Sequence, residues 1–259
     1  MIFFCSPFSC RKLFVFLQQT IAMVATSNVE VGFKLYLQAA LAADRYAGPR
    51  KGRSEALEQY GPMPSELVSQ AFALYEQGIT DTRMQQRCIV AIMGTLLDCC
   101  SLSDDDYQGL VTKAAQFSAK TVKKSDQCQL VAQCALLFYP AENTHLTYRN
   151  PQRALECLQR ALKLADSCTT ANSEDIYLFV DLLEHYLYFF DKKCPTISDA
   201  YVAGLVALIK EHMGNLGSSG NVSAVVSNAR EQFNQIVHVI KEKKEKAETS
   251  EQYSPIKLD

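Results

Sequence analysis

Two consecutive helices are predicted by residues 150–190, which read NPQRALECLQRALKLADSCTTANSEDIYLFVDLLEHYLYFF. Asn150 is a typical N-cap residue. Pro151 suits the first helical position, because a backbone N–H there has no partner within the helix and its absence in proline costs nothing. Apolar residues then recur every three or four positions, as on the buried face of an amphipathic helix. The second helix, over residues 176–190, is apolar on nearly every side, as expected for a helix that packs between two neighbours. The stretch therefore predicts stacked helices.

Further helix starts divide the rest of the chain at a regular interval. Helices are predicted to begin near Asp81, Asp104, Asp126, Pro151, Glu174 and Thr196. The helices recur at roughly 22–25 residues and pairs of helices at about 45, which is the period of HEAT-like or armadillo-like hairpins. Ser103 is expected to cap the helix that it precedes, and Gly214 to end a helix in the left-handed conformation. Residues 30–44 and 64–77 predict an earlier hairpin. The fold class is therefore all-α, an α-solenoid of HEAT-like helical hairpins.

The solenoid is expected to occupy residues 11–247. Its first helix, over residues 11–25, carries apolar side chains at helical spacing: Leu13, Phe14, Leu17, Ile21 and Val24. Residues 1–10 are expected to be a poorly ordered extension. They do not resemble a signal peptide, because no positive charge precedes their apolar run. Residues 46–64 predict a polar loop within the solenoid, with a short basic patch at Arg50, Lys51 and Arg53 that is either simply exposed or binds an acidic partner or lipid. The charge run 241–246 is expected to be solvated, and residues 248–259 to form a tail.

The charge balance and the glycine and proline content limit which functions and folds are expected. The 26 Lys and Arg residues nearly balance the 28 Asp and Glu residues, so the formal net charge is −2. A nucleic-acid-binding protein normally carries an excess of positive charge, so nucleic acid is not an expected partner. The chain has only 11 glycines and 8 prolines among 259 residues, which favours helices over a turn-rich β-fold.

The ten cysteines lie mostly in apolar, helix-periodic stretches. They form no C-x-x-C pair and do not stand at zinc-ligand spacing from the histidines. A disulfide framework is typical of short, loop-rich secreted chains, unlike this one. We therefore expect reduced thiols that pack as small hydrophobic groups, in a cytoplasmic protein.

One group of residues could support chemistry. Asp181, Glu184 and His185 lie within one helical turn and could ligate a metal, but such helices usually work with a second ligand set on a partner helix, and none is recognisable. A histidine on the surface, or one with a satisfied hydrogen bond, is the favoured interpretation. The glycine-rich stretch 214–220 lacks the Lys-Ser/Thr of a phosphate loop and predicts a connector. No catalytic residue, metal or cofactor is predicted, and an enzyme is a distant third hypothesis.

Several separated motifs resemble the C-terminal half of the vacuolar protein sorting-associated protein 35 family. The motifs are residues 35–40 (LYLQAA), 69–76 (SQAFALYE), 79–81 (ITD), 123–127 (KKSDQ), 157–165 (CLQRALKLA), 186–190 (YLYFF) and 253–258 (YSPIKL). With residues 11–14 (RKLF) and 19–21 (QTI), the resemblance spans residues 10–258 in order.

The resemblance implies a non-catalytic scaffold subunit of the retromer coat, in the cytoplasm and peripheral on the endosome membrane through its coat partners. Such a subunit serves endosomal protein sorting, retrograde endosome-to-Golgi transport and recycling. In the family, this half of the protein docks vacuolar protein sorting-associated protein 29, the small subunit with a phosphoesterase fold, and supports self-association. The family proteins are longer, so we expect a truncated or paralogous form.

The resemblance also places the partner contact on one helix. The family usually reads Asp-Gln-x-Arg-Ala-Val-x-x-Cys-x-His-Leu-Phe-Trp there, and residues 126–139 read DQCQLVAQCALLFY. The expected partner-binding residues are Asp126, Gln127, Gln129, Leu130, Cys134, Leu136, Leu137, Phe138 and Tyr139.

Three of these residues, Gln129, Leu136 and Tyr139, replace Arg, His and Trp. Loss of a buried hydrogen bond there would weaken binding by about 1–3 kcal/mol, roughly ten- to a hundredfold, whereas Leu136 could instead add apolar burial. Cys134, Leu137 and Phe138 have core packing as their alternative role. A divergent helical-repeat interaction module that has lost retromer binding is therefore the alternative function.

Overall fold

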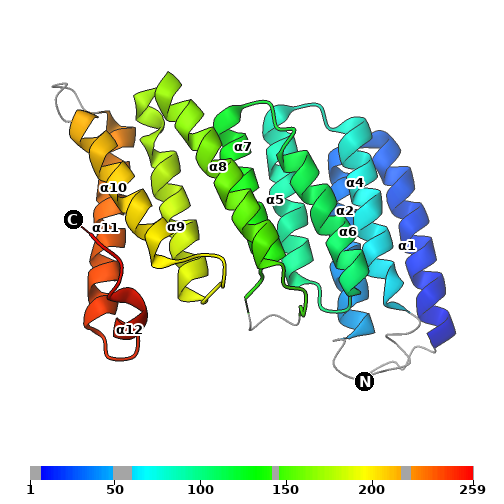
Figure 1. The fold of residues 1–259 in the computed structure, drawn as a ribbon. Helices are drawn as coiled ribbons and strands as arrows, with labels where there is room; N and C mark the ends of the chain where they lie inside the picture. The colour runs from blue at the N-terminus through cyan, green and yellow to red at the C-terminus, as the bar shows by residue number, and fades with distance from the viewer. Residues whose placement is uncertain (1–6, 49–59, 142–145, 217–222, 259) are drawn as a thin grey trace. The chain divides into compact units, whose positions relative to one another are not determined.

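Every regular element is a helix in the part of the chain that the computed structural model describes, residues 7–48, 60–141, 146–216 and 223–258 (Figure 1). The elements are α1 (Pro7–Ser27), α2 (Val29–Ala47), α4 (Pro62–Gly78), α5 (Thr82–Asp98), α6 (Asp104–Ser118), α7 (Lys124–Phe138), α8 (Pro151–Ala171), the 3₁₀ turn η1 (Ser173–Ile176), α9 (Tyr177–Asp191), α10 (Asp199–Leu216), α11 (Ala224–Glu245) and α12 (Ser250–Tyr253). Within the described ranges, no helix is both long enough and apolar enough to cross a bilayer.

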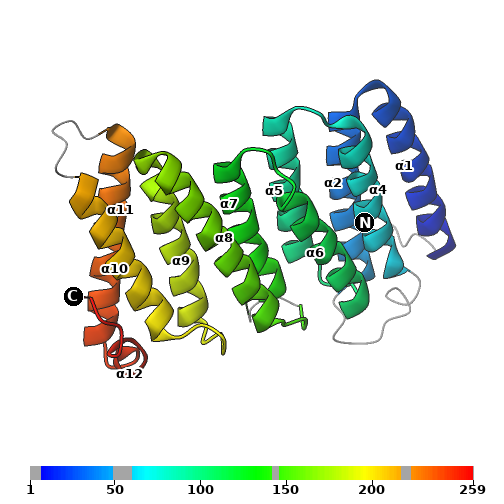
Figure 2. The same cartoon turned by 45° about the horizontal axis from the view of Figure 1, so that its top comes forward.

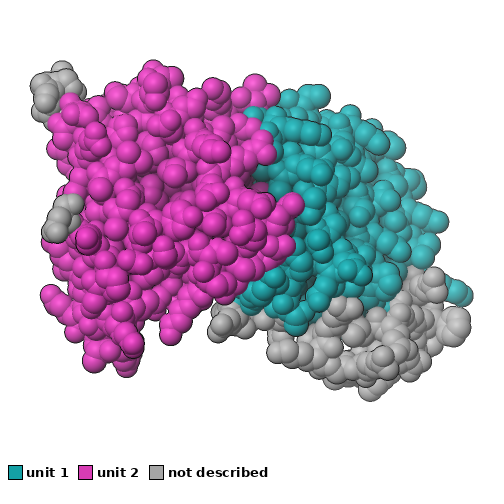
Figure 3. All heavy atoms as spheres, viewed as in Figure 1, with its two compact units in different colours: residues 1–121, 140–149 teal, residues 122–139, 150–259 magenta. Residues whose placement is uncertain are grey.

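The helices form two compact units (Figure 3). Unit 1 consists of residues 1–121 and 140–149, and unit 2 of residues 122–139 and 150–259. In unit 1, α2 packs against α1 and α4, and α5 packs against α6. In unit 2, α7 pairs with α8, and α9 contacts α7, α8, α10 and α11 (Figure 2). This packing of successive helices confirms the predicted all-α solenoid.

Local side-chain chemistry explains where the helices begin. The side chains of Asp81, Ser103 and Asn150 each accept a hydrogen bond from the backbone N–H three residues later, at 2.7, 3.0 and 3.0 Å. These bonds satisfy amide groups that have no partner within the helix. The helix starts predicted at these three residues are therefore confirmed.

The prediction for Gly214 was wrong. α10 continues to Leu216, and the only positive φ angles in the described residues are those of Gly48, at 77°, and Lys193, at 53°. A glycine inside a helix costs only about 0.5–1 kcal/mol relative to alanine, so Gly214 does not by itself end the helix.

The core of unit 2 is centred on α9, as its composition predicts. Eight of its residues are buried: Leu178, Phe179, Val180, Leu182, Leu183, Tyr186, Phe189 and Phe190. Such a helix is stable only when its neighbours cover most of its surface, and α9 has four helical neighbours.

In unit 1, α1 and α2 approach each other closely. Of the predicted apolar face of α1, Phe14 and Ile21 are buried, Leu17 and Val24 are partly exposed and Leu13 is 60% exposed, so the predicted face is only partly buried. A Cβ atom on Gly32 of α2 would lie 2.5 Å from the Cβ of Ala25. The absence of a side chain at Gly32 therefore permits this contact.

The segments expected outside the helices can be compared with the element bounds. α1 begins at Pro7, within the expected N-terminal extension 1–10, and residues 1–6 lie outside the described residues. The expected loop 46–64 was drawn too long, since residues 46–47 belong to α2 and residues 62–64 to α4, and residues 49–59, with the basic patch, also lie outside the description. The expected tail 248–259 contains α12, and its Tyr253 and Ile256 are fully buried.

The eight cysteines within the described residues are free thiols, and six of them are buried. Burial raises the pKa of Cys88 to about 11 and that of Cys157 to about 11, so both thiols stay protonated at neutral pH. The thiols therefore act as small core side chains, as the sequence predicts.

Candidate partner-binding surface

The residues predicted to bind a partner fall on two sides of α7. Leu130, Cys134, Leu137 and Phe138 are at most 1% exposed. Asp126, Gln127, Gln129, Leu136 and Tyr139 are partly exposed. The helical period accounts for part of this division, since Gln129 and Leu136 lie seven positions apart on one face, whereas Gln127 lies three positions before the buried Leu130.

The buried set has partners inside unit 2. The guanidinium group of Arg153 on α8 lies over the ring of Phe138, 5.2 Å from its centroid. Burial of Leu130, Cys134 and Leu137 fits the core-packing role that was the alternative for two of these residues. Direct contact with a partner in this conformation is therefore open only to the partly exposed set.

A small pocket lies between the exposed side of α7 and α9. Its volume is about 190 Å³, and its polar lining comes from Gln129 and Gln133 on α7 and from Asp181, Glu184 and His185 on α9. The Nε2 amide of Gln129 donates a hydrogen bond to Oδ2 of Asp181 at 3.0 Å. Gln129 is thus a predicted partner-binding residue that also forms a hydrogen bond between α7 and α9.

A larger pocket of about 360 Å³ lies between α9 and α11. Leu187, Ile236 and Val239 provide its apolar lining, and Asp191 and Lys243 also border it. Glu184 lines both pockets, and its Oε1 accepts a hydrogen bond from Nε2 of Gln232 on α11 at 2.9 Å. We call the two pockets together the α7–α9–α11 groove.

Electrostatics distinguish Asp181 from Asp191, two of the three acidic residues of α9 that line this groove. Burial raises the pKa of Asp181, and the negative charge of Glu184 raises it further, while the hydrogen bond from Gln129 acts in the opposite direction. Burial likewise disfavours the charged form of Asp191, but hydrogen bonds from Lys243 and Tyr253 outweigh it and lower the pKa of Asp191. The ionised carboxylate is therefore stabilised at one end of the groove and disfavoured at the other.

Asp181, Glu184 and His185 do not assemble into a metal centre. Across the described ranges, no three His, Cys, Asp or Glu side chains lie close enough together to hold a metal ion. The Nδ1 atom of His185 lies 2.8 Å from the backbone oxygen of Asp181 and must donate to it, because a carbonyl oxygen only accepts. These residues instead line the groove.

The α11 side of the groove was missed by the sequence analysis. Gln232, Ile236, Val239 and Lys243 recur every three or four residues, so the helical period places them on one face. Their spacing was available in the sequence, but their position beside α9 was not.

Comparisons with known proteins agree with the motifs. The family model described as vacuolar protein sorting-associated protein 35 matches residues 6–212. Vacuolar protein sorting-associated protein 35 of Schizosaccharomyces pombe is 31% identical over 205 residues, which cover 78% of this chain and 23% of that protein. Vacuolar protein sorting-associated protein 35B of Arabidopsis thaliana is 33% identical over 256 residues, covering 96% of this chain and 30% of that protein.

A second Arabidopsis thaliana relative, vacuolar protein sorting-associated protein 35A, is 34% identical over 209 residues, covering 78% of this chain and 25% of that protein. The chain thus spans about a quarter of the length of the curated relatives that it matches. Because the family model covers well over half of the chain and the described fold is all-α, the chain belongs to the vacuolar protein sorting-associated protein 35 family.

Proposed function

We propose that this chain is a non-catalytic scaffold subunit of the retromer coat that docks vacuolar protein sorting-associated protein 29 in the α7–α9–α11 groove. It would serve endosomal protein sorting, retrograde endosome-to-Golgi transport and recycling, in the cytoplasm and peripheral on the endosome membrane. The observation that carries the proposal is that Gln129, one of the partly exposed residues on α7, lines a pocket against α9 that Glu184 joins to a second pocket against α11.

The chemistry of the groove suits a protein partner. Leu187, Ile236 and Val239 offer apolar contact area, while Glu184 and Gln232 offer hydrogen-bonding groups beside it. Protein interfaces typically combine an apolar centre with a polar rim in this way. The described groove consists of side chains on helices, so it is largely pre-formed, which lowers the entropic cost of binding.

Leu136 lines neither pocket, but it provides the sharpest test of the α7 side of the surface, since it is partly exposed, has no polar side-chain group and lies seven positions after Gln129, on the same face. Calorimetric titration with the small subunit from the same organism would compare the unaltered chain with Leu136→Glu. A charge buried without a partner at the interface should weaken binding by about tenfold or more. Leu162→Glu is the matched control, because Leu162 is also partly exposed but lies on α8. Equal binding by the unaltered chain and Leu136→Glu would refute the proposed surface.

The alternative is a helical-repeat module that has lost retromer binding. It is favoured by Gln129 and Leu136 on α7 and Tyr139 at its C-cap, which depart from the family pattern and are all partly exposed. In that case the unaltered chain would not bind the small subunit, and Leu136→His would restore measurable binding. If neither form binds while both remain folded by circular dichroism, the proposed docking is wrong.

A further inference from the structure

Residues 249–258, which we call the C-terminal strap, fold back onto unit 2. The strap contains α12, which packs against α11 (Figure 1). Tyr253 and Ile256 are fully buried, although the residues around them are partly or wholly exposed. Two buried side chains in a segment of ten residues indicate that the strap is a packed part of the unit.

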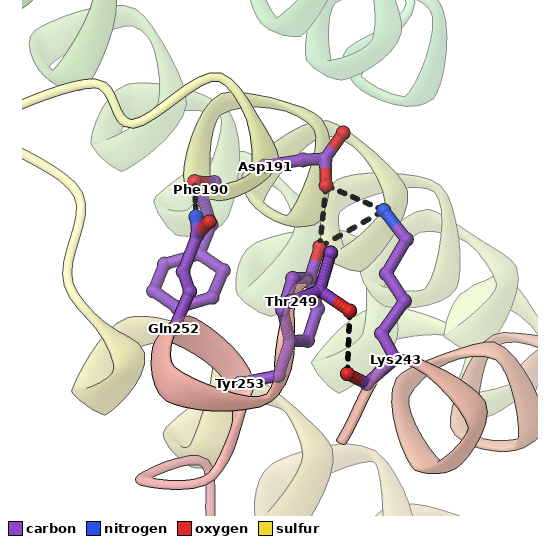
Figure 4. Close-up of polar contacts among 6 residues, drawn as sticks. All are labelled: Phe190, Asp191, Lys243, Thr249, Gln252 and Tyr253. Atoms are coloured by element: carbon purple, nitrogen blue, oxygen red, sulfur yellow. Dashed lines mark hydrogen bonds and ion pairs between the residues drawn. The ribbon is translucent and has the colours of Figure 1, made fainter. Parts of the chain in front are cut away.

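Tyr253 is the main anchor of the strap. Its ring meets the ring of Phe190 edge to face, with centroids 5.2 Å apart, and the ammonium group of Lys243 lies 5.0 Å from its centroid. Its hydroxyl donates to Oδ1 of Asp191 at 2.9 Å and accepts from Nζ of Lys243 at 3.2 Å (Figure 4). Lys243 also pairs with Asp191 at 2.5 Å, so the three side chains form a closed triangle.

Further hydrogen bonds fasten the strap to three helices. Gln252 donates to the backbone oxygen of Phe190 in α9, and Thr249 donates to that of Lys243 in α11, at 2.5 and 2.6 Å (Figure 4). Lys244 of α11 and Lys210 of α10 donate to backbone oxygens of Ile256 and Leu258 within the strap. The strap therefore links the ends of helices that are far apart in sequence.

The triangle also borders the groove, since Asp191 and Lys243 both line the α9–α11 pocket. Their side chains are 35% and 28% exposed, and such a pair alone would hold its geometry weakly because a lysine side chain has many rotamers. The buried ring of Tyr253 adds the constraint that the ion pair lacks. We propose that the C-terminal strap fixes the end of the α9–α11 pocket, with Tyr253 as the positioning residue for Asp191 and Lys243.

The test uses the full chain and needs no partner. Amide hydrogen exchange would be measured in the unaltered chain, in Tyr253→Phe and in Tyr253→Ala, for peptides from the strap, the end of α9 and the end of α11. Peptides from α2 and α4 in unit 1 report whether the rest of the fold is intact. Tyr201→Phe is the matched control, because it removes a tyrosine hydroxyl in the same unit that lies outside the strap and accepts a hydrogen bond from Gln159 at 3.4 Å.

The strap predicts a graded result. Tyr253→Ala should raise exchange at the ends of α9 and α11 roughly tenfold or more, since opening of a local unit sets that rate. Tyr253→Phe keeps the ring and loses the hydroxyl, so it should raise exchange by a smaller factor, and Tyr201→Phe should leave both ends unchanged. If exchange rises in the strap alone, the strap does not position the groove and the proposal is wrong. If Tyr253→Ala does not fold, equal exchange in Tyr253→Phe and the unaltered chain would likewise show that the proposal is wrong.

The consequence for binding rests on the proposed function. If the unaltered chain binds the small subunit, Tyr253→Ala should bind it about tenfold more weakly and Tyr201→Phe equally well. Unchanged affinity alongside faster exchange at α9 and α11 would refute the positioning of the groove for this partner. Failure of the unaltered chain to bind would refute the proposed docking, and the exchange result would still decide the role of the strap.

Discussion

Replacing Asp44 by alanine is expected to destabilise unit 1 by about 3–4 kcal/mol. Asp44 lies near the end of α2, and its side chain is buried with only 2% of the residue exposed. Its carboxylate accepts hydrogen bonds from the backbone N–H groups of Cys100 and Ser101, at 2.9 and 2.8 Å, and from the Ser101 hydroxyl at 2.7 Å. This carboxylate thus holds the turn between α5 and α6 against α2.

The magnitude follows from which donors water can reach. Cys100 is partly exposed, so water replaces the bond that its N–H loses. Ser101 is 3% exposed, so its N–H and its hydroxyl would remain buried without an acceptor. Two lost bonds to a charged acceptor, at about 1.5–2 kcal/mol each, give the expected loss. Asp44→Asn keeps the shape and can keep Oδ1, the oxygen to which both Ser101 donors bond, but it loses the negative charge, so a smaller loss than in Asp44→Ala is expected.

Urea unfolding followed by circular dichroism would measure the free energy of unfolding. Hydrogen exchange in peptides of α2 and α5 would assign the loss to unit 1. Asp98→Ala is the matched control, because Asp98 is an exposed acid at the end of α5 and its removal should change stability by less than about 0.5 kcal/mol. If Asp44→Ala and Asp98→Ala differ by less than about 1 kcal/mol, the hydrogen bonds of Asp44 do not hold this turn.

Three further substitutions have expected outcomes in the same unfolding assay. The pKa of Asp191 is lowered, so this residue contributes stability above its unfolded pKa of about 3.9 that is lost as pH falls through the lowered folded value. Asp191→Asn should therefore be less stable than the unaltered chain at pH 7 and lack that acid loss, and a variant with an unchanged acid profile would contradict the argument. The pKa of Asp181 is raised by burial, so its contribution has the opposite sign: it is present below the unfolded pKa and lost as pH rises through the raised folded value. Asp181→Asn should then be more stable than the unaltered chain at pH 7, and a loss of stability there would show that the Gln129 bond outweighs burial. Gly32→Ala should destabilise unit 1 by about 1–3 kcal/mol because its Cβ would lie 2.8 Å from the backbone Cα of Ala25, whereas Gly94→Ala, with no atom within 4 Å, should be neutral or stabilising.

The fold could be predicted from the sequence because its signals are local. An N-cap such as Ser103 acts on an amide group three residues away, and the apolar character of α9 is visible within fifteen residues. The missed helix end at Gly214 follows from the same logic, since a glycine permits a left-handed turn without requiring one. Local sequence preference therefore identified most helix starts and failed at Gly214, where the residue is compatible with both a helix end and a helix interior.

The groove and the strap depend on contacts between distant residues, which no local pattern contains. Gln232 meets Glu184 across 48 residues, and Tyr253 meets Asp191 across 62. The charge run 241–246 illustrates the limit, because its composition predicts a solvated segment. Lys241 and Lys246 are exposed as expected, but Lys243 and Lys244 turn toward the strap and are partly buried. Lys241 and Lys244 lie three positions apart, as do Lys243 and Lys246, so the helical period does not predict this difference. It follows from the contacts of Lys243 and Lys244 with Asp191 and the strap.

The departures of α7 from the pattern of the family that it resembles follow burial in part. Cys134, Leu137 and Phe138 match the pattern and are buried in unit 2, where a change of volume would disturb close packing. Gln129 and Leu136, which replace Arg and His, are partly exposed, so they can change at little cost to the fold. The division is incomplete, because Leu130 replaces the alanine of the pattern and is buried, while Asp126 and Gln127 match the pattern and are partly exposed. Selection for stability would act on the buried face and leave the exposed face free. Binding to the small subunit would constrain the exposed face as well, so the titration of Leu136→Glu and Leu136→His measures which of the two constraints acts on this helix.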